Sequence, residues 1–488
     1  MLKNSETPPL WTRDEVEKIC GGKWIVPPPG GWAAYGFTYY PNQIRSGDLA
    51  MSTSAPSWPK KSFKDTTTNI SHIFALGAAA LITDRAPVEK DLLGPLLLVE
   101  DTREAMDRLG GLARERIAGK VVCVTGSAGK TSTKDALGFV LGRQAPSFAA
   151  PHSYNTHYGV PLHLAQTPPG TAYAVYEVAV STVKGISRMA KMLRPHVGLI
   201  TNVHDNHLDV HKSVHGLALA KAQIFSGMAE GGTAVLNRDD GQFPALVEAS
   251  AGYGVANIIS FGVHEEADAR LVSVKLEADG SDVEAEIFGE PIRFRTGAAG
   301  RNWVINSLGI LACVRALGAD ISKAAAALAD FATLDGRGKV YALPLPGGTF
   351  QLMNDSFNAT PASMVAGFET ASLLTPGPGG RRVAVLGEIG HLGEKSEELH
   401  RGLAKAVDAW KFDRLFTIGN EMVHLHNSAS VHLQAFHANS LDELYAAVLA
   451  YLRAGDVVYV KGSLSVEFRV SIVVDHLIEL ERAGSPMK

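Results

Sequence analysis

The residues best suited to chemistry lie together in one short glycine-rich loop, Thr125-Gly126-Ser127-Ala128-Gly129-Lys130-Thr131-Ser132. An apolar run at 121–124 precedes this loop, and a helical pattern at 131–141 follows it. A strand that runs through a glycine turn into a helix points several backbone N–H groups and the helix N-terminus at one spot, an arrangement that binds polyphosphate. We therefore predict that residues 126–132 hold the phosphates of a nucleotide.

The side chains of this loop have separate expected roles. Lys130 would reach the β- and γ-phosphates, and the hydroxyl of Thr131 or Ser132 would ligate Mg²⁺, which prefers oxygen ligands. Only two residues separate Gly126 from Gly129, whereas the general phosphate-loop motif has four between its glycines. The alternative, a glycine turn before a helix with an incidental lysine, fits the strand–loop–helix context less well.

Three regions of the chain differ in pattern. Residues 1–115 have short apolar segments and turn-rich stretches, which is typical of a small α/β domain. In 116–335, helical stretches alternate with apolar strands that we expect at 121–124, 173–178, 197–201 and 233–236. The pattern restarts in 336–488, where apolar strands end at Gly387, Gly419 and Gly462. Such alternation predicts parallel sheets that bind ligands at the carboxyl ends of their strands.

Composition limits the classes of function. The 488 residues carry a formal charge of -4, so no net basic field would attract nucleic acid or an anionic membrane. Any anionic ligand must be held locally. The three widely spaced cysteines argue against a disulfide framework or a thiolate zinc site. The longest apolar run, 73–82, is shorter than the roughly 20 residues of a membrane span, so we expect a cytoplasmic protein.

Motifs in chain order, beginning with TGSAGKTS, resemble those of the Mur ligases, which join a carboxylate to an amine at the expense of ATP. The other matching segments are SYNTHYGVPL (153–162), VYEVAVSTVKGI (175–186), RPHVGLITNVHDNHLD (194–209), ALAKAQIF (218–225), GRNWVINSL (300–308), NDSFNATPASM (354–364) and VYVKGS (458–463). The resemblance implies an α/β fold of three domains. These are an N-terminal substrate-binding domain at 1–115, a central ATP-binding P-loop domain at 116–335, and a C-terminal Rossmann-like domain at 336–488 that binds the amine.

The resemblance also implies a mechanism in which ATP converts the carboxylate to an acyl phosphate and an amine displaces the phosphate. Thr131 and Glu177 would hold one Mg²⁺, while His207 and Lys221 would hold a second. Lysine is a cation and cannot ligate a metal as it stands, so Lys221 is expected to be carbamylated. Glu177 ends an apolar strand, where an unpaired buried carboxylate would be costly. This cost favours a metal partner for Glu177 over the alternative, a side chain turned to solvent.

Other residues take expected roles from the same resemblance. Lys130 and Arg337 join the catalytic set, with Arg337 reaching the γ-phosphate as the domains close. Asn306 would contact adenine, and Asp355 and Asn358 would contact the nucleotide or product. Lys461 would either bind an acidic group or extend outward to solvent.

Four histidines invite a rival interpretation. His204, His207, His211 and His215 include three at a spacing of four, which on one helix could bind zinc. No HExxH pattern accompanies them, and only His207 falls on a family position. We therefore expect one functional histidine and three solvated ones.

The resemblance weakens at positions that would face the substrate. The stretch TYYPNQIRSGDLAMSTSAPSWPKKSF departs from the family pattern, and so do Asn354, Phe357, Thr360, Trp303 and Leu464. We therefore favour an amide ligase recruited to another carboxylate and amine over the family member that adds D-Ala-D-Ala to UDP-MurNAc-tripeptide in peptidoglycan synthesis. A non-catalytic ATP-binding protein is a third, weaker hypothesis.

Overall fold

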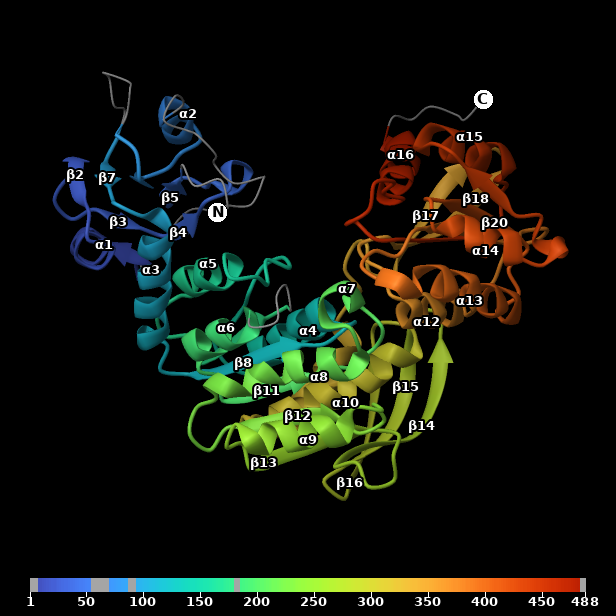
Figure 1. Ribbon diagram of the computed structural model, residues 1–488, viewed down its shortest axis with the longest axis horizontal. Coiled ribbons are helices and arrows are strands. Elements are labelled where there is room, and N and C mark those ends of the chain that lie inside the picture. The colour runs from blue at the N-terminus through green and yellow to red at the C-terminus, as the bar shows by residue number, and fades with distance from the viewer. Residues whose placement is uncertain (1–7, 54–69, 87–93, 180–184, 483–488) are drawn as a thin grey trace. The chain divides into compact units, whose positions relative to one another are not determined.

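The structure is a computed structural model that describes residues 8–53, 70–86, 94–179 and 185–482 (Figure 1). Residues 180–184 of the expected Glu177 segment lie outside this described part. The described chain forms two compact units. One contains Met1–Val124, Leu137–Gly198 and Gln223–Gly232, and the other contains Thr125–Ala136, Leu199–Ala222 and Thr233–Lys488.

The first range, 1–115, contains a five-stranded sheet in the order β2-β7-β6-β5-β4 and a short pair, β1-β3. Strands β4 to β7 pair in parallel, and β2 joins them antiparallel. Ala50, Ile73 and Leu81 lie in the buried core between sheet and helix. The elements are β1 (Trp11–Thr12), α1 (Arg13–Cys20), β2 (Lys23–Val26), β3 (Ala33–Ala34), β4 (Gly36–Thr38), η1 (Pro41–Gln43), β5 (Asp48–Ser52), α2 (Ile70–Ala75), β6 (Ala80–Thr83), β7 (Leu96–Leu98) and α3 (Thr102–Arg116).

The middle sheet has the strand order β16-β15-β14-β13-β12-β11-β8-β10-β9. Its strands are β8 (Lys120–Thr125), β9 (Ser147–Ala149), β10 (Tyr173–Glu177), β11 (Val197–Ile200), β12 (Thr233–Asn237), β13 (Asn257–Gly262), β14 (Ala269–Glu277), β15 (Gly280–Ile287) and β16 (Glu290–Thr296). Its helical segments are α4 (Lys130–Gly142), α5 (Gly159–Gln166), α6 (Gly185–Leu193), α7 (Leu208–His211), α8 (Val214–Ala222), η3 (Gln223–Gly227), α9 (Phe243–Gly252), α10 (Arg301–Ala316), α11 (Ile321–Ala327) and η4 (Leu328–Asp330).

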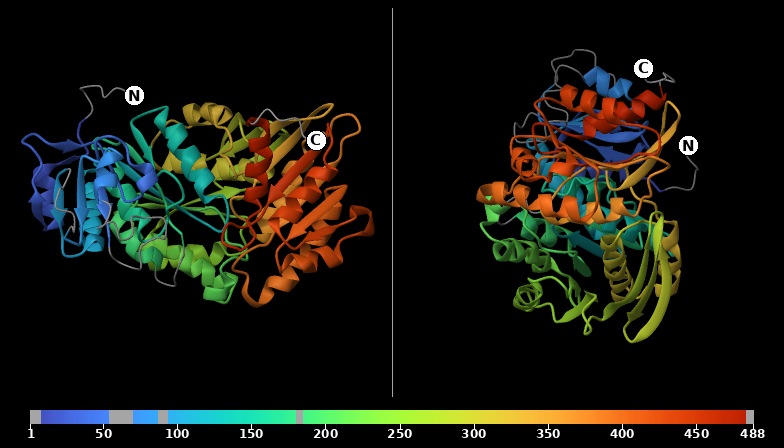
Figure 2. Two further views of the ribbon diagram at one scale, coloured as in Figure 1. Left: turned by 90° about the horizontal axis from the view of Figure 1, so that it is seen from above. Right: turned by 90° about the vertical axis from the view of Figure 1, so that its right-hand side faces the viewer.

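The predicted strands and crossover helices of this range are confirmed, because β8, β10, β11 and β12 lie where the apolar runs placed them. One part of the sheet was not predicted. Strands β14, β15 and β16 pair antiparallel and extend the parallel sheet, as the yellow-green strands of Figure 2 show. Asp279-Gly280 spans the end of the first turn and the start of β15, and Asp-Gly is a pair that favours hairpins.

The last range holds a six-stranded sheet in the order β17-β18-β22-β19-β20-β21. Only β17 pairs antiparallel. The elements are β17 (Lys339–Leu345), β18 (Gly348–Asp355), α12 (Pro361–Ser372), β19 (Arg382–Gly387), η5 (Gly393–Lys395), α13 (Ser396–Ala409), β20 (Arg414–Ile418), α14 (Met422–Ser428), η6 (Val431–Leu433), β21 (Phe436–Ala438), α15 (Leu441–Tyr451), β22 (Val457–Lys461) and α16 (Ser471–Arg482).

Strand β19 shows why this sheet carries helices on both faces. Successive side chains of a strand point to opposite faces. Ala384 and Leu386 pack in a core with α12, α13 and α14, whereas Val383 and Val385 pack in a second core with α15 and α16 (Figure 1). The continuous apolar run therefore buries both faces of a doubly wound sheet, and it places the carboxyl ends of β18, β19 and β22 at one edge.

Candidate functional site

The loop between β8 and α4 has the backbone of a phosphate loop. Gly126 and Gly129 have φ values of 152° and 78°, which side-chain-bearing residues rarely adopt. A Cβ atom at Gly126 would lie 1.9 Å from Thr201 Oγ1, and one at Gly129 would lie 2.7 Å from Asn306 Nδ2. Both glycines are thus required by conformation and by space.

Asn202 fixes the middle of this loop. Its backbone carbonyl accepts a hydrogen bond from Ser127 N–H at 2.9 Å, and its side-chain oxygen accepts one from Ala128 N–H at 2.9 Å. Thr201 Oγ1 donates to Ala128 O at 2.7 Å. The amides of Ser127 and Ala128 therefore face the protein in this conformation, and the N–H groups at the start of α4, around Ser132, are the ones a helix leaves for an anion.

Two charged side chains form hydrogen bonds with the loop. Lys130 Nζ donates to the carbonyl oxygens of Gly126 at 2.9 Å and Ser127 at 3.3 Å, so the lysine folds back over the loop. Arg337, which precedes β17, donates from Nη2 to Thr131 Oγ1 at 2.9 Å. The guanidinium also lies over the ring of Phe357, 4.1 Å from its centroid. The structure thus brings Arg337 to the loop, and its contact with the γ-phosphate stays a prediction.

Lys221 is a buried lysine whose amine is affected by the charge of Lys130 in the loop. It lies on α8 and is 2% exposed. Burial and the charge of Lys130 lower its pKa well below the usual value, against the opposing effect of Asp240. Burial therefore makes the unprotonated amine of Lys221 easier to reach than that of an exposed lysine.

His207 lies close to the two lysines. Burial, then His391, Lys221 and Lys130, lower the pKa of its imidazole to about 4, so the ring is neutral at pH 7. Its backbone is left-handed, with φ 52°. A neutral imidazole can accept a metal ion or a proton, which a protonated ring could not.

Glu177 ends β10 and is 4% exposed. Its Oε1 accepts a hydrogen bond from Asn155 Nδ2 at 2.6 Å, and its residue pairs in register with Val124 at the end of β8. The alternative of a strand-end carboxylate turned to solvent is therefore wrong. Asn155 orients a buried carboxylate, and carboxylate oxygens suit a hard cation.

The residues of the last range that we expect to contact the nucleotide interact with other side chains of the protein. Lys461 Nζ lies 2.5 Å from Asp355 Oδ2, and Tyr459 OH donates to the same oxygen at 3.2 Å. Asn358 Oδ1 accepts from Ser463 Oγ at 3.4 Å. Of the two alternatives for Lys461, the structure shows binding to an acidic group, and the lysine does not extend to solvent.

Two family models match the chain. A model of the Mur ligase middle domain matches residues 124–314, and a model of the Mur ligase glutamate ligase domain matches residues 336–464. The two ranges together take up well over half of the chain. The chain belongs to the Mur ligase family.

Curated relatives of this Mur ligase bear the name UDP-N-acetylmuramoyl-tripeptide--D-alanyl-D-alanine ligase. The relative from Rickettsia prowazekii is 26% identical over 400 residues, which are 82% of this chain and 87% of the relative. The relative from Escherichia coli is 29% identical over 346 residues, which are 71% of this chain and 74% of the relative.

Solved structures show the same fold. A structure of MurF from Acinetobacter baumannii matches with a TM-score of 0.80 at 24% identity, covering 96% of this chain and 99% of that one. The MurF ligase from Thermotoga maritima, solved in complex with ADP, matches with a TM-score of 0.72 at 26% identity, covering 92% and 98%. The chain is therefore a MurF-like Mur ligase with the α/β architecture of that family. In its described part, no helix has the length and apolarity to cross a bilayer.

The histidines of this Mur ligase differ from the expectation in one respect. His204 and His215 are exposed, as predicted, but His211 is 8% exposed, so the interpretation of His211 as solvated is wrong. Its Nε2 is buried without a hydrogen-bond partner among the described residues. The short helix α7 turns His211 inward, whereas a spacing of four on one long helix would have kept the histidines on one face.

Several positions that depart from the family pattern in this Mur ligase are packed into the structure. Asn354 donates to Asp335 Oδ1 at 2.6 Å. The Trp303 ring lies 5.4 Å from that of Phe331. Phe357 supports Arg337, as described above. These contacts show that the three residues take part in the packing of the structure.

Sequence reasoning missed Asn155 and Asp240 as supporting residues. Asp240 accepts from Val203 N at 2.5 Å and favours the charged form of Lys221. It follows the end of β12, and a polar residue after a parallel strand is a signal that could have pointed to it. Asn155 lies within a matched motif, but only the structure shows that it contacts Glu177.

Proposed function

We propose that the chain is an ADP-forming ligase that joins D-alanyl-D-alanine to UDP-N-acetylmuramoyl-tripeptide. The observation that carries this proposal is the likeness to ligases of that name over most of both chains. The likeness favours this substrate pair over the recruited amide ligase that the divergent N-terminal segment suggested. The glycine-rich loop with Lys130 and Arg337 favours turnover over nucleotide binding alone.

Activation of the carboxylate depends on how the chain holds ATP. The amides at the start of α4 would bind the phosphates, and Lys130 would exchange its two loop carbonyls for phosphate oxygens. Arg337 would balance the negative charge that develops on the transferred phosphoryl group. Asn306, buried on α10 beside Gly129, would fix the nucleotide through its amide.

The residues present also fit two magnesium ions. Thr131 and Glu177 offer a hydroxyl and a carboxylate, which are the oxygen ligands that Mg²⁺ prefers. His207 offers a neutral nitrogen. Bound there, the metal would neutralise charge on the phosphates and so ease attack by the carboxylate.

Lys221 fits this arrangement only after modification. Its buried neutral amine would attack CO₂ through the nitrogen lone pair, form an N–C bond and release a proton, giving an anionic carbamate with two oxygens. The depressed pKa supports this step, since only the unprotonated amine carries the lone pair. Carbamylated Lys221 is thus part of the proposal. The proposal also includes the three expected domains, at 1–115, 116–335 and 336–488.

A coupled assay tests the substrates. Purified protein with ATP and Mg²⁺ should release phosphate only when UDP-N-acetylmuramoyl-tripeptide and D-alanyl-D-alanine are both present, and mass spectrometry should find the ligated product. Lys130→Ala, with its fold checked by circular dichroism, should lose all but a few percent of this activity. Phosphate release that needs a different acid or amine would revive the recruited-ligase hypothesis, and nucleotide binding without release would support the non-catalytic one.

A further inference from the structure

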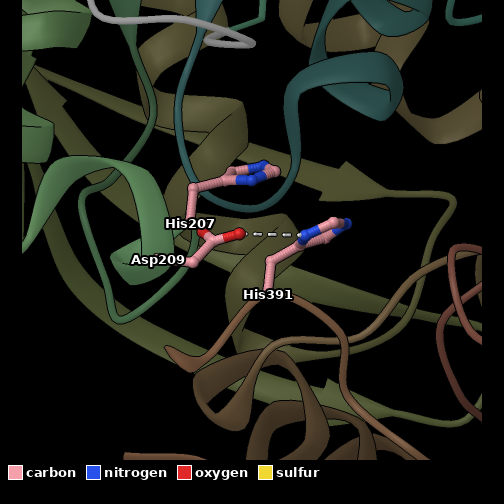
Figure 3. A group of neighbouring side chains, drawn as sticks. All are labelled: His207, Asp209 and His391. Atoms are coloured by element: carbon pink, nitrogen blue, oxygen red, sulfur yellow. Dashed lines mark ion pairs between the residues drawn. The ribbon is translucent and has the colours of Figure 1, made fainter. Parts of the chain in front are cut away.

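Three potential metal ligands meet where the segment that follows β11 lies near the turn after β19. His207 and Asp209 flank the start of α7, and His391 lies in the turn between β19 and η5 (Figure 3). One ligand atom from each lies within 4.8 Å of the others. The three side chains thus come from two segments far apart in the sequence.

Two of the ligand atoms already have the separation of a tetrahedral site. Asp209 Oδ2 lies 3.4 Å from His391 Nδ1. Two ligands bound at about 2.0 Å around tetrahedral Zn²⁺ are roughly 3.3 Å apart. The ring centroids of His207 and His391 are 5.2 Å apart, and the third ligand atom lies within 4.8 Å of the other two, so metal binding would draw the His207 side chain closer.

The backbone holds these segments together without the metal. Leu208 N–H donates to the carbonyl oxygen of His391 at 3.2 Å. A Cβ at Gly393 would lie 3.3 Å from Asp209 N, so the turn passes tightly over the start of α7. Both histidines adopt the left-handed conformation, with φ of 52° and 64°. Such strained positions occur mainly at functional sites.

The ligand chemistry distinguishes this site from a magnesium site. Two imidazoles and one carboxylate are typical of Zn²⁺ and its neighbours, whereas Mg²⁺ takes oxygen ligands. The two histidines offer ring nitrogens, and half-exposed Asp209 offers a carboxylate oxygen. An ion pair of Asp209 with His391 alone would use only two of the three groups and would contribute little at this exposure.

We propose that His207, Asp209 and His391 bind one Zn²⁺ ion, which ties the segment at 205–211 to the turn at 388–395. This zinc site shares His207 with the magnesium set proposed above, and its other two ligands belong to none of the predicted site residues. Zinc bound here would withhold His207 from catalysis.

Metal titration of the full chain, without nucleotide or Mg²⁺, tests the site. Protein stripped of metal with a chelator should bind one equivalent of Co²⁺ with a visible absorption band of low-symmetry coordination, and Zn²⁺ should displace it. In competition with a chromophoric chelator, His391→Ala and Asp209→Asn should each bind Zn²⁺ at least about tenfold more weakly. His432→Ala is the matched control, because His432 forms an exposed pair with Asp408 at 3.8 Å. It should bind Zn²⁺ like the unmodified protein.

Hydrogen exchange provides a second measurement, independent of turnover. Zn²⁺ should slow exchange of the Leu208 amide in the unmodified protein and leave it unchanged in His391→Ala. The site is refuted if His391→Ala and the unmodified protein bind Zn²⁺ equally. Zinc binding that does not slow the Leu208 amide would overturn the link between the two segments.

Discussion

The ion pair of Asp355 with Lys461 allows a sharp test of whether Asp355 is an anchor of the fold or a ligand of the nucleotide. The Lys461 side chain is 4% exposed and that of Asp355 is 19% exposed. Asp355→Asn leaves the ammonium buried beside a neutral amide. Removing one partner of a buried pair costs about 3–5 kcal/mol, and the partial exposure of Asp355 favours the lower end, about 3 kcal/mol.

The single variant Lys461→Met and the double variant should lose less free energy of unfolding than Asp355→Asn. Lys461→Met leaves a carboxylate that still reaches solvent and still accepts from Tyr459, so we expect a loss of about 1 kcal/mol. The double variant removes both charges and should lose only about 1–2 kcal/mol, which gives a coupling free energy of roughly 2–3 kcal/mol.

Hydrogen exchange of the amides in β18 and β22 measures these local free energies, which a global unfolding curve of a multidomain chain would blur. The control cycle, Glu397→Gln with Arg401→Met, removes an exposed pair of α13 and should show a coupling below about 1 kcal/mol. Equal losses for Asp355→Asn and Lys461→Met would refute the argument from burial. If the double variant is stable but binds ATP poorly, Asp355 is a nucleotide ligand after all.

Three further outcomes are expected. Gly129→Ala should weaken ATP binding by about tenfold in calorimetry, since an alanine in the left-handed conformation costs roughly 1–2 kcal/mol. The control Gly142→Ala should leave ATP binding unchanged. Equal affinities of the two variants would contradict the loop geometry. Lys221→Met should abolish ligation yet raise stability by about 1–2 kcal/mol in thermal unfolding, because it removes a buried amine. A short carboxylic acid should partly restore the activity of Lys221→Ala. A destabilised Lys221→Met, or Lys221→Ala without rescue, would count against the buried carbamate. Burial lowers the pKa of His400 below 6.5, so the folded state takes up a proton less readily than the unfolded state, and stability should fall as the pH drops below 6.5. His400→Gln should therefore reduce the decline of the urea midpoint between pH 7.5 and 5.5. An unchanged pH dependence would contradict this role of His400.

The sequence predicts the parallel strands and the glycine-rich loop because both depend on local patterns. Apolar runs such as 121–124 need only burial on both faces, and glycines that end strands mark turns whatever their surroundings. The hairpins of β14 to β16 were missed although Asp279-Gly280 signals a turn, because alternating polar and apolar residues on a half-exposed extension give a weaker signal than a buried run.

The partners of side chains could not be predicted in the same way. The burial of His211, the hold of Asn202 on two loop amides and the meeting of Asp209 with His391 each depend on how distant segments pack. Spacing along the chain says which residues share a helix face, but it does not say which carbonyl an amide will meet. The site could therefore be assembled from motifs as a set of residues, whereas its internal contacts had to come from the structure.

The hydrogen bond from Arg337 to Thr131 has a consequence for the order of events in turnover. The hydroxyl that a magnesium ion would ligate already accepts a bond from the arginine that would face the γ-phosphate. On the proposed function, a nucleotide arriving with its metal would separate the two, and product departure would let them rejoin. The hydrogen bond would then keep both groups in position between turnovers, and Arg337→Ala would speed nucleotide entry while it slows the chemical step.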